Sequence, residues 1–194
     1  MLDSKTRELR DDRLEQVAHM LGERFKRAEC GQIKDFVGQF YARVSTEDIC
    51  AAAPENLYGA ALSLWKFAAQ RDAGELKLRV YNPRTEEHGW KSAHAIVEIV
   101  TDDMPFLVDS VTGNLNQWRC QVHWAIHPVI RLRRDDQGAR QELLPPVANG
   151  KPGISEAVMH VQIAEQSDGA ALEKIAADLR GVLADVRVAV ADWP

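Results

Sequence analysis

The chain has 194 residues, of which 45% are hydrophobic and 27% are charged, and its formal net charge is −5 at pH 7. This length holds one sizeable domain, or one domain with a helical extension. The acidic balance lacks the basic footprint of a nucleic-acid-binding protein, and no apolar run reaches the roughly 18–20 residues of a membrane span. The charged N-terminus has no signal-peptide core, and three widely spaced cysteines are typical of a reduced, cytoplasmic protein.

Residues 1–75 have the apolar spacing of α-helices. One stripe covers residues 9–21 and a second covers residues 33–41. Ser45 begins the string STED, which is typical of a capping box at a helix start. A longer amphipathic helix is predicted from residue 54 to Gly74, since glycine is a common helix stop. We therefore predict an N-terminal helical segment.

From residue 76 the pattern changes to the period-two alternation of strands. Residues 76–80 alternate as a half-buried strand does, and residues 84–92 are polar and predict a loop. Residues 93–100 are almost continuously apolar, which is typical of a strand covered on both faces. Residues 122–133 alternate as one long strand whose residues 122, 124, 126, 130 and 132 share a face. Pro128 removes a ladder donor, so this strand is bent, bulged or at an edge there.

The remaining elements follow in chain order. The string DDQG at 135–138 predicts a hairpin turn, with a short return strand at 140–144. Residues 145–155 are turn-forming, and residues 157–163 alternate as a further strand. Apolar stripes predict helices at 107–118 and 172–190. The order β-β-α-β-β-β-α from residue 76 contains the β-α-β-β-α core of a ferredoxin-like sheet with two helices on one face.

The sequence contains no recognisable set of catalytic residues. It has no dinucleotide-binding fingerprint, no nucleophile elbow and no zinc-protease motif. His123 and His127 are four residues apart, but on a strand that spacing separates them by roughly 13 Å, which is too far for one metal ion. His94 and His160 are interpreted as hydrogen-bonded structural histidines. We therefore predict no catalytic, cofactor-binding or metal-binding residue.

The acidic, proline-punctuated elbow between the buried strand and the next helix is the strongest candidate site. One interpretation is a capped helix start, because carboxylates before a helix accept its free N–H groups and face its positive dipole end. Pro105 suits the first helical turn. The other interpretation is that free amides and one aspartate receive a polar ligand such as an amino acid. The candidate residues are Asp102, Asp103, Met104, Pro105 and Phe106.

The elbow string DMPFLV at 103–108 resembles the D-x-P-G-L-L turn of ACT domains, small β-α-β-β-α-β regulatory modules that bind amino acids at elbows and dimer interfaces. Phe106 stands where ACT domains usually have glycine, which lets a ligand approach the backbone. A phenylalanine would block or reshape that approach. We expect an α+β fold with an ACT-like, ferredoxin-like antiparallel sheet over residues 76–194, helices packed on one face, and the helical segment 1–75 before it.

A wider resemblance covers residues 34–194. The chain is similar there to the N-terminal region of the large-subunit bacterial NAD-specific glutamate dehydrogenases. The residues 192–194, DWP, resemble the junction of that family with its next helical segment. The resemblance rests on the strings DI (48–49), LYGAALSLW (57–65), RVYNP (79–83), EHGW (87–90), VTDDMPFLVDSV (100–111) and HPV (127–129).

The resemblance implies an N-terminal fragment of an oxidoreductase that converts L-glutamate, water and NAD to 2-oxoglutarate, ammonium and NADH. The catalytic domains of the family lie downstream in the same chain, so the fragment would be inactive alone and hold no cofactor. It would regulate or assemble a homo-oligomer, with an amino acid as its effector. Two alternatives stay open: a stand-alone amino-acid sensor that uses the elbow, and a structural module that dimerises through exposed sheet edges.

Overall fold

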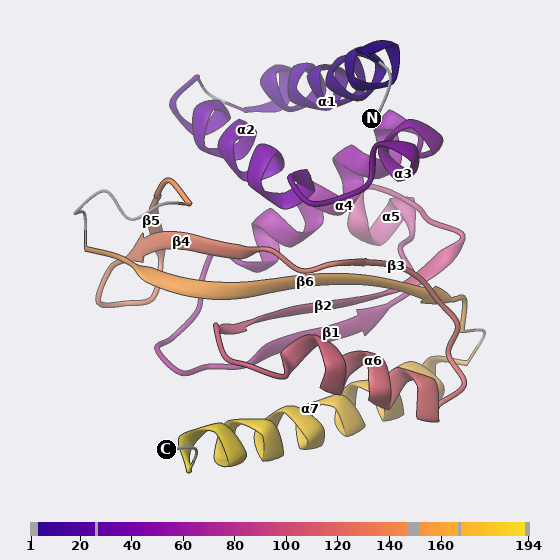
Figure 1. Cartoon of the computed structure of the whole chain (residues 1–194), viewed down its shortest axis with the longest axis vertical. Coiled ribbons are helices and arrows are strands. Elements are labelled where there is room, and N and C mark those ends of the chain that lie inside the picture. The colour runs from indigo at the N-terminus through magenta and orange to yellow at the C-terminus, as the bar shows by residue number, and fades with distance from the viewer. Residues whose placement is uncertain (1–3, 26, 147–151, 167, 193–194) are drawn as a thin grey trace.

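The computed structural model describes residues 4–25, 27–146, 152–166 and 168–192, which form three layers (Figure 1). Four helices cover one face of an antiparallel sheet: α1 (Ser4–Arg24), α2 (Arg27–Tyr41), α3 (Thr46–Ala51) and α4 (Pro54–Phe67). Two helices cover the other face: α6 (Leu107–Gln117) and α7 (Gly169–Ala191). The predicted α+β class, with an ACT-like sheet after N-terminal helices, is confirmed.

The sheet has six strands, and every pair is antiparallel. Its order is β1-β2-β6-β4-β5, and β3 pairs with the far end of β6. The central strands β2 and β6 place the turn after β2 next to the start of β6, because Asp102 is paired with Glu156. The strands are β1 (Lys77–Tyr81), β2 (His94–Asp102), β3 (Val122–Ile126), β4 (Val129–Arg134), β5 (Arg140–Leu143) and β6 (Ile154–Ala164).

The prediction of one strand over residues 122–133 is corrected by the structure. The strand is interrupted at His127 and Pro128. The Pro128 carbonyl accepts the Val158 N–H at 3.0 Å, and β3 and β4 pair with successive parts of β6. A register shift between Val122 and Trp124 also moves the Val122 side chain to the other face of the sheet. Val122 packs with the α6 and α7 side of the sheet, whereas Trp124 packs with the N-terminal helices. Simple alternation therefore assigned Val122 to the wrong face, because a bulge adds one residue to the count.

Two other boundaries differ from the predictions. Helix α4 ends at Phe67 rather than Gly74, because the next segment bonds to the β4–β5 turn: the Arg71 N–H donates to the Gly138 carbonyl at 3.0 Å. The predicted loop 84–92 contains the short helix α5 (Thr85–His88), which ends at Gly89 with a φ of 76°. Glycine reaches this left-handed conformation without a steric penalty.

Several local predictions are confirmed. The Ser45 hydroxyl caps α3 by accepting the Asp48 N–H at 3.1 Å. The hairpin turn forms between β4 and β5, where the Gly138 N–H donates to the Asp135 carbonyl at 2.9 Å. Strand β6 begins earlier than expected, at Ile154. Of the predicted turn 145–155, residues 147–151 lie outside the described part, as do 193–194 of the predicted junction.

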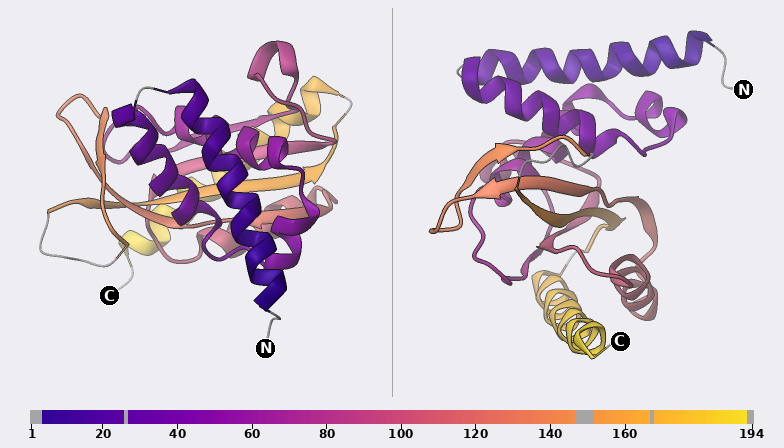
Figure 2. Two further views of the ribbon diagram at one scale, coloured as in Figure 1. Left: turned by 90° about the horizontal axis from the view of Figure 1, so that it is seen from above. Right: turned by 60° about the vertical axis from the view of Figure 1, so that its left-hand side comes forward.

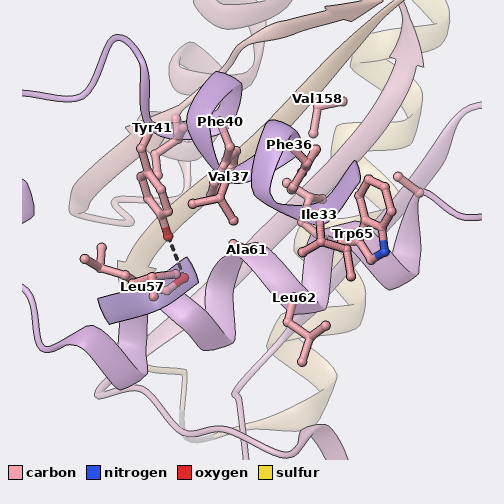
Figure 3. Packing of buried hydrophobic residues seen from close by; sticks show 14 of the residues in the cluster. Ile33, Phe36, Val37, Phe40, Tyr41, Leu57, Ala61, Leu62, Trp65 and Val158 are labelled. Atoms are coloured by element: carbon pink, nitrogen blue, oxygen red, sulfur yellow. Dashed lines mark hydrogen bonds between the residues drawn. The ribbon is translucent and has the colours of Figure 1, made fainter. Parts of the chain in front are cut away.

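The N-terminal helices share a hydrophobic core with the sheet. Phe36 and Phe40 of α2 stack with ring centroids 5.5 Å apart, and the buried Tyr41 hydroxyl donates to the Leu57 carbonyl of α4 at 2.7 Å (Figure 3). The helical layer thus lies directly on the sheet (Figure 2). The boundary at residue 75 stays a prediction. The strand residues in this cluster are Val100, Ile126, Ile130, Leu132 and Val158.

A second core lies between the sheet and the helices α6 and α7. The predicted stripe of the last helix is present, since Ile175, Leu179 and Leu183 are buried against the alternate residues of β2 and β6. In the described residues, no helix combines the length and hydropathy that a bilayer crossing requires.

Candidate functional site

The elbow after β2 is a four-residue turn with an unusual final residue. Strand β2 ends at Asp102, and Phe106 is the N-cap of α6 with a φ of 67° and a ψ of 1°. The Phe106 side chain makes no capping hydrogen bond, and among the described residues no carboxylate accepts an N–H group of the first turn of α6. The prediction of a carboxylate-capped start is therefore wrong, and Pro105 precedes the helix instead of lying in its first turn. The left-handed Phe106 changes the direction of the chain between Asp102 and Asp103 on one side and the first N–H groups of α6 on the other.

The side chain of Phe106 is half exposed. Its backbone lies in the left-handed region that disfavours bulky L-residues. Glycine, which ACT domains usually have at this position, enters that region freely. The positive φ is thus a conformational reason for glycine in such turns, in addition to the close approach of a ligand.

A hollow of about 150 Å³ lies beside the elbow. It brings together three of the five candidate residues, Asp103, Met104 and Phe106, while Asp102 and Pro105 do not line it. The second carboxylate of the hollow comes from Asp109, on the first turn of α6. Two carboxylates and an apolar floor suit a small cationic or ammonium group beside an apolar one. The remaining lining residues are Leu107, Val108, His127, Val129, Ala157 and Met159.

Asp102 instead belongs to a buried ion network on the side of the N-terminal helices. Arg71 is 1% exposed and donates to Asp102 at 2.6 Å and to the fully buried Glu156 at 2.7 Å. Burial would lower the pKa of Arg71, but hydrogen bonding to the two carboxylates outweighs burial and raises this pKa. Arg134 donates to both oxygens of Glu156 at 2.8 Å. Because each buried charge has a partner, the network is satisfied and holds the elbow to the sheet.

The same network fixes the segment after α4. Arg134 also donates to the Ala68 carbonyl at 2.9 Å and to the Gly138 carbonyl at 2.8 Å. Arg71 donates to the Glu75 carbonyl at 2.8 Å. Guanidinium groups have five donors in a rigid fork, so two arginines can hold carboxylates and several carbonyls together. This arrangement connects the elbow mechanically to the helical layer and the β4–β5 hairpin.

A second polar cluster is buried under α4, around Glu98 of β2. Arg79 donates to Glu98 at 2.7 Å and the Tyr81 hydroxyl donates to it at 3.1 Å. The Nδ1 atom of His160 lies 3.5 Å from a Glu98 oxygen. Burial would raise the pKa of the Glu98 carboxyl, but His160 and the Arg79 guanidinium outweigh it and lower this pKa. The Ser63 and Tyr81 hydroxyl oxygens, 2.7 Å apart, complete the cluster.

The prediction that His160 is hydrogen-bonded is wrong: its buried Nδ1 lies 3.5 Å from Glu98, near enough to act on that carboxylate through its charge, but neither ring nitrogen makes a hydrogen bond. The His94 ring lies 4.2 Å from the His123 ring, and burial together with this neighbour lowers the pKa of His94. The described part of the chain contains no group of three metal-ligating side chains. The three cysteines are free thiols, and burial raises the pKa of Cys120.

Sequence reasoning missed both ion clusters, although one left a signal. Glu98 interrupts an otherwise apolar strand, and a carboxylate in such a strand requires a cationic or hydrogen-bonding partner. Arg79 and Tyr81, in the predicted strand 76–80 and just after it, could have been proposed as those partners. Arg71 left no such signal, because it lies in a polar stretch that the periodicity does not distinguish from a solvated helix end.

Comparisons with known proteins agree with the fold. Residues 36–179 match the family described as "Glutamate dehydrogenase, ACT1 domain". The chain is 38% identical over 193 residues to the NAD-specific glutamate dehydrogenase of Halomonas elongata, covering 100% of this chain and 12% of that protein. It is 35% identical over 162 residues to the Pseudomonas aeruginosa protein of the same name, covering 84% of this chain and 10% of that protein. The chain thus spans about a tenth of these relatives, and it belongs to the glutamate dehydrogenase ACT1 domain family.

Proposed function

We propose that this chain is an N-terminal regulatory and assembly domain of a cytoplasmic, NAD-dependent glutamate dehydrogenase. The observation that carries the proposal is the match to an ACT1 domain in a chain about a tenth as long as its relatives. The parent enzyme converts L-glutamate, water and NAD to 2-oxoglutarate, ammonium and NADH. Its catalytic domains lie in the rest of the same polypeptide, and the enzyme is a homo-oligomer.

The chain alone is expected to have no dehydrogenase activity. Purified residues 1–194 are incubated with L-glutamate and NAD, and NADH absorbance is followed. We expect no absorbance above a sample without protein. Steady NADH formation that increases with the amount of purified chain would contradict the proposal.

The regulatory and assembly role is tested in the parent enzyme. Full-length enzyme is compared with a version lacking residues 1–194, by light scattering for mass and by NADH formation for activity. We expect the shortened enzyme to contain fewer subunits per oligomer, or to have a changed rate or effector response. The same number of subunits, rate and effector response in both versions would overturn the role.

A second candidate function is amino-acid sensing at the elbow, which the hollow beside Asp103 and Asp109 favours. Both carboxylates suit the ammonium group of an amino acid. Calorimetry with a panel of amino acids is expected to give heat of binding that Asp103→Ala weakens. Asp136→Ala, in the exposed hairpin turn, is the matched control. No heat with any amino acid, together with an unchanged thermal midpoint, would count against sensing.

A further inference from the structure

Exposed apolar side chains gather around the elbow. Six large hydrophobic residues are exposed in the described part of the chain, and three of them, Phe106, Val129 and Val188, line two adjoining hollows. The half-buried Met104 belongs to both hollows and joins them. We name these residues, together with Leu76, the elbow surface. Scattered exposed hydrophobic residues are ordinary, but a continuous group of them marks a contact surface.

The two hollows carry opposite charges. The hollow of about 150 Å³ beside α6 contains Asp103 and Asp109. The other, of about 280 Å³, lies between the elbow and the last turns of α7, and its single charged residue is Arg187. The elbow surface therefore has a cationic half and an acidic half with Met104 between them. Both hollows are lined by residues of the core between the sheet and the helices α6 and α7, which form the lower layer in Figure 1.

These charges have unused capacity. Arg187 is 43% exposed; its guanidinium donates to the Gly74 carbonyl at 2.5 Å, but its nearest carboxylate, on Asp102, is 3.9 Å away and is already held by Arg71 at 2.6 Å. Within residues 4–25, 27–146 and the later described segments, neither Asp103 nor Asp109 makes an ion pair. Exposed charges of this kind contribute little to the stability of one copy but can select a partner.

The backbone at Phe106 adds an independent observation. A left-handed conformation is unfavourable for a non-glycine residue, because Cβ approaches the following carbonyl oxygen. Here that conformation presents a half-exposed aromatic ring in the acidic half of the elbow surface, beside Met104. Such local strain is concentrated at functional contacts, and aromatic residues are enriched among the energetically important residues of interfaces.

We propose that the elbow surface docks a second copy of this chain about a two-fold axis near Met104, the residue that both hollows share. A two-fold interface must be self-complementary. The axis exchanges the two hollows, so Arg187 of one copy faces the acidic half of the other, while the apolar residues meet between them. This inference rests on the proposed assembly role and names the surface that performs it. The surface is separate from the exposed sheet edges considered above.

The test is a charge exchange in residues 1–194. Mass is measured by sedimentation over a concentration series for the unaltered chain, Arg187→Glu, Asp109→Arg and the double variant. We expect a dimer whose dissociation constant rises about tenfold or more in each single variant, because like charges then face each other. The double variant restores the dimer, since the two charges have only exchanged places. Lys174→Glu and Asp136→Arg, exposed charge reversals away from the surface, are expected to leave the dimer unchanged.

Three outcomes overturn the docking surface: a monomer at every concentration, a dimer indifferent to both single variants, or no recovery in the double variant. Arg187 also donates to the Gly74 carbonyl at 2.5 Å and to Thr101 Oγ1 at 3.3 Å, so Asp109→Arg provides a second test free of those bonds. A dimer that ignores these variants would leave the assembly role intact and place it on another surface. The role itself fails only in the full-length comparison described above.

Discussion

Phe106 shows how one residue decides the shape of the elbow. A glycine at this position loses the steric penalty of about 1–2 kcal/mol for the left-handed conformation, but gains roughly 0.5–1 kcal/mol of unfolded-state entropy. We expect Phe106→Gly to keep or slightly raise the free energy of unfolding. Urea denaturation of dilute protein measures the difference.

The matched comparison is Phe106→Val. A β-branched side chain is poorly accommodated at positive φ, so this variant is expected to lose about 1 kcal/mol or more relative to Phe106→Gly. Equal midpoints for the two variants would show that the left-handed conformation does not control stability at this position. Half-exposed Phe106 gives up little buried surface in either variant.

Glu98 makes stability depend on pH. Its carboxyl has a lowered pKa in the folded chain, so its ionised form is stabilised by folding. That contribution is complete above the ordinary pKa of about 4.5 and is lost as the pH falls through the lowered folded value. We expect the urea midpoint of the unaltered chain to fall more steeply between pH 5 and 3 than that of Glu98→Gln. At pH 7 the variant is expected to lose about 2 kcal/mol, because charged hydrogen bonds are removed.

Parallel acid profiles for the two proteins would contradict this assignment.

The prediction for His160, which lies in the same cluster, was only partly right. Burial of His160 follows from its place in an alternating strand, whereas its neighbours depend on which residues the fold brings above that strand. Those neighbours are Phe40 of α2 and Trp90 of the loop after α5.

At the scale of elements, α4 and the loop after α5 pack closely together at a glycine, Gly59. A Cβ added to Gly59 would lie 2.6 Å from the Trp90 side chain, so the indole occupies the space that only glycine leaves. We expect Gly59→Ala to lower the free energy of unfolding by about 1–3 kcal/mol, since the loop must move.

Gly38→Ala in α2 is the control, because nothing lies within 4 Å of its added Cβ. Alanine is favoured over glycine inside a helix by about 1 kcal/mol, so this variant is expected to be neutral or stabilising. If thermal melts showed both substitutions stabilising the chain, the close contact with Trp90 would not be a constraint.

The strands show where periodicity succeeds and where it fails. The fully buried β2 and the alternating β6 were predictable, because burial on one face or two leaves a clear pattern. Pro128 indicated an irregularity in the segment 122–133, which the structure divides into β3 and β4. The face of Val122 was not, because a bulge shifts the alternation without changing residue types.

At the scale of the whole molecule, the helical layer completes the sheet. Removing residues 1–75 would expose the apolar face that includes Val100, Ile130 and Val158 and would remove Arg71 from Glu156. We expect residues 76–194 alone to lose near-ultraviolet circular dichroism or to aggregate. A cooperative melt of this fragment at the midpoint of the full chain would instead support an independent domain beginning at residue 76.

The sequence by itself determined the class of fold, the order of its main elements and its family. These depend on local periodicity, turn residues and strings such as the elbow, all of which lie within short stretches of chain. Only the tertiary structure decided that Asp102 turns to Arg71 while Asp103 faces the hollow, and that Phe106 is left-handed. The first of these outcomes depends on Arg71, which lies 31 positions from Asp102 and 85 positions from Glu156 along the chain. Electrostatic and packing contacts at such separations leave no periodic trace in the sequence.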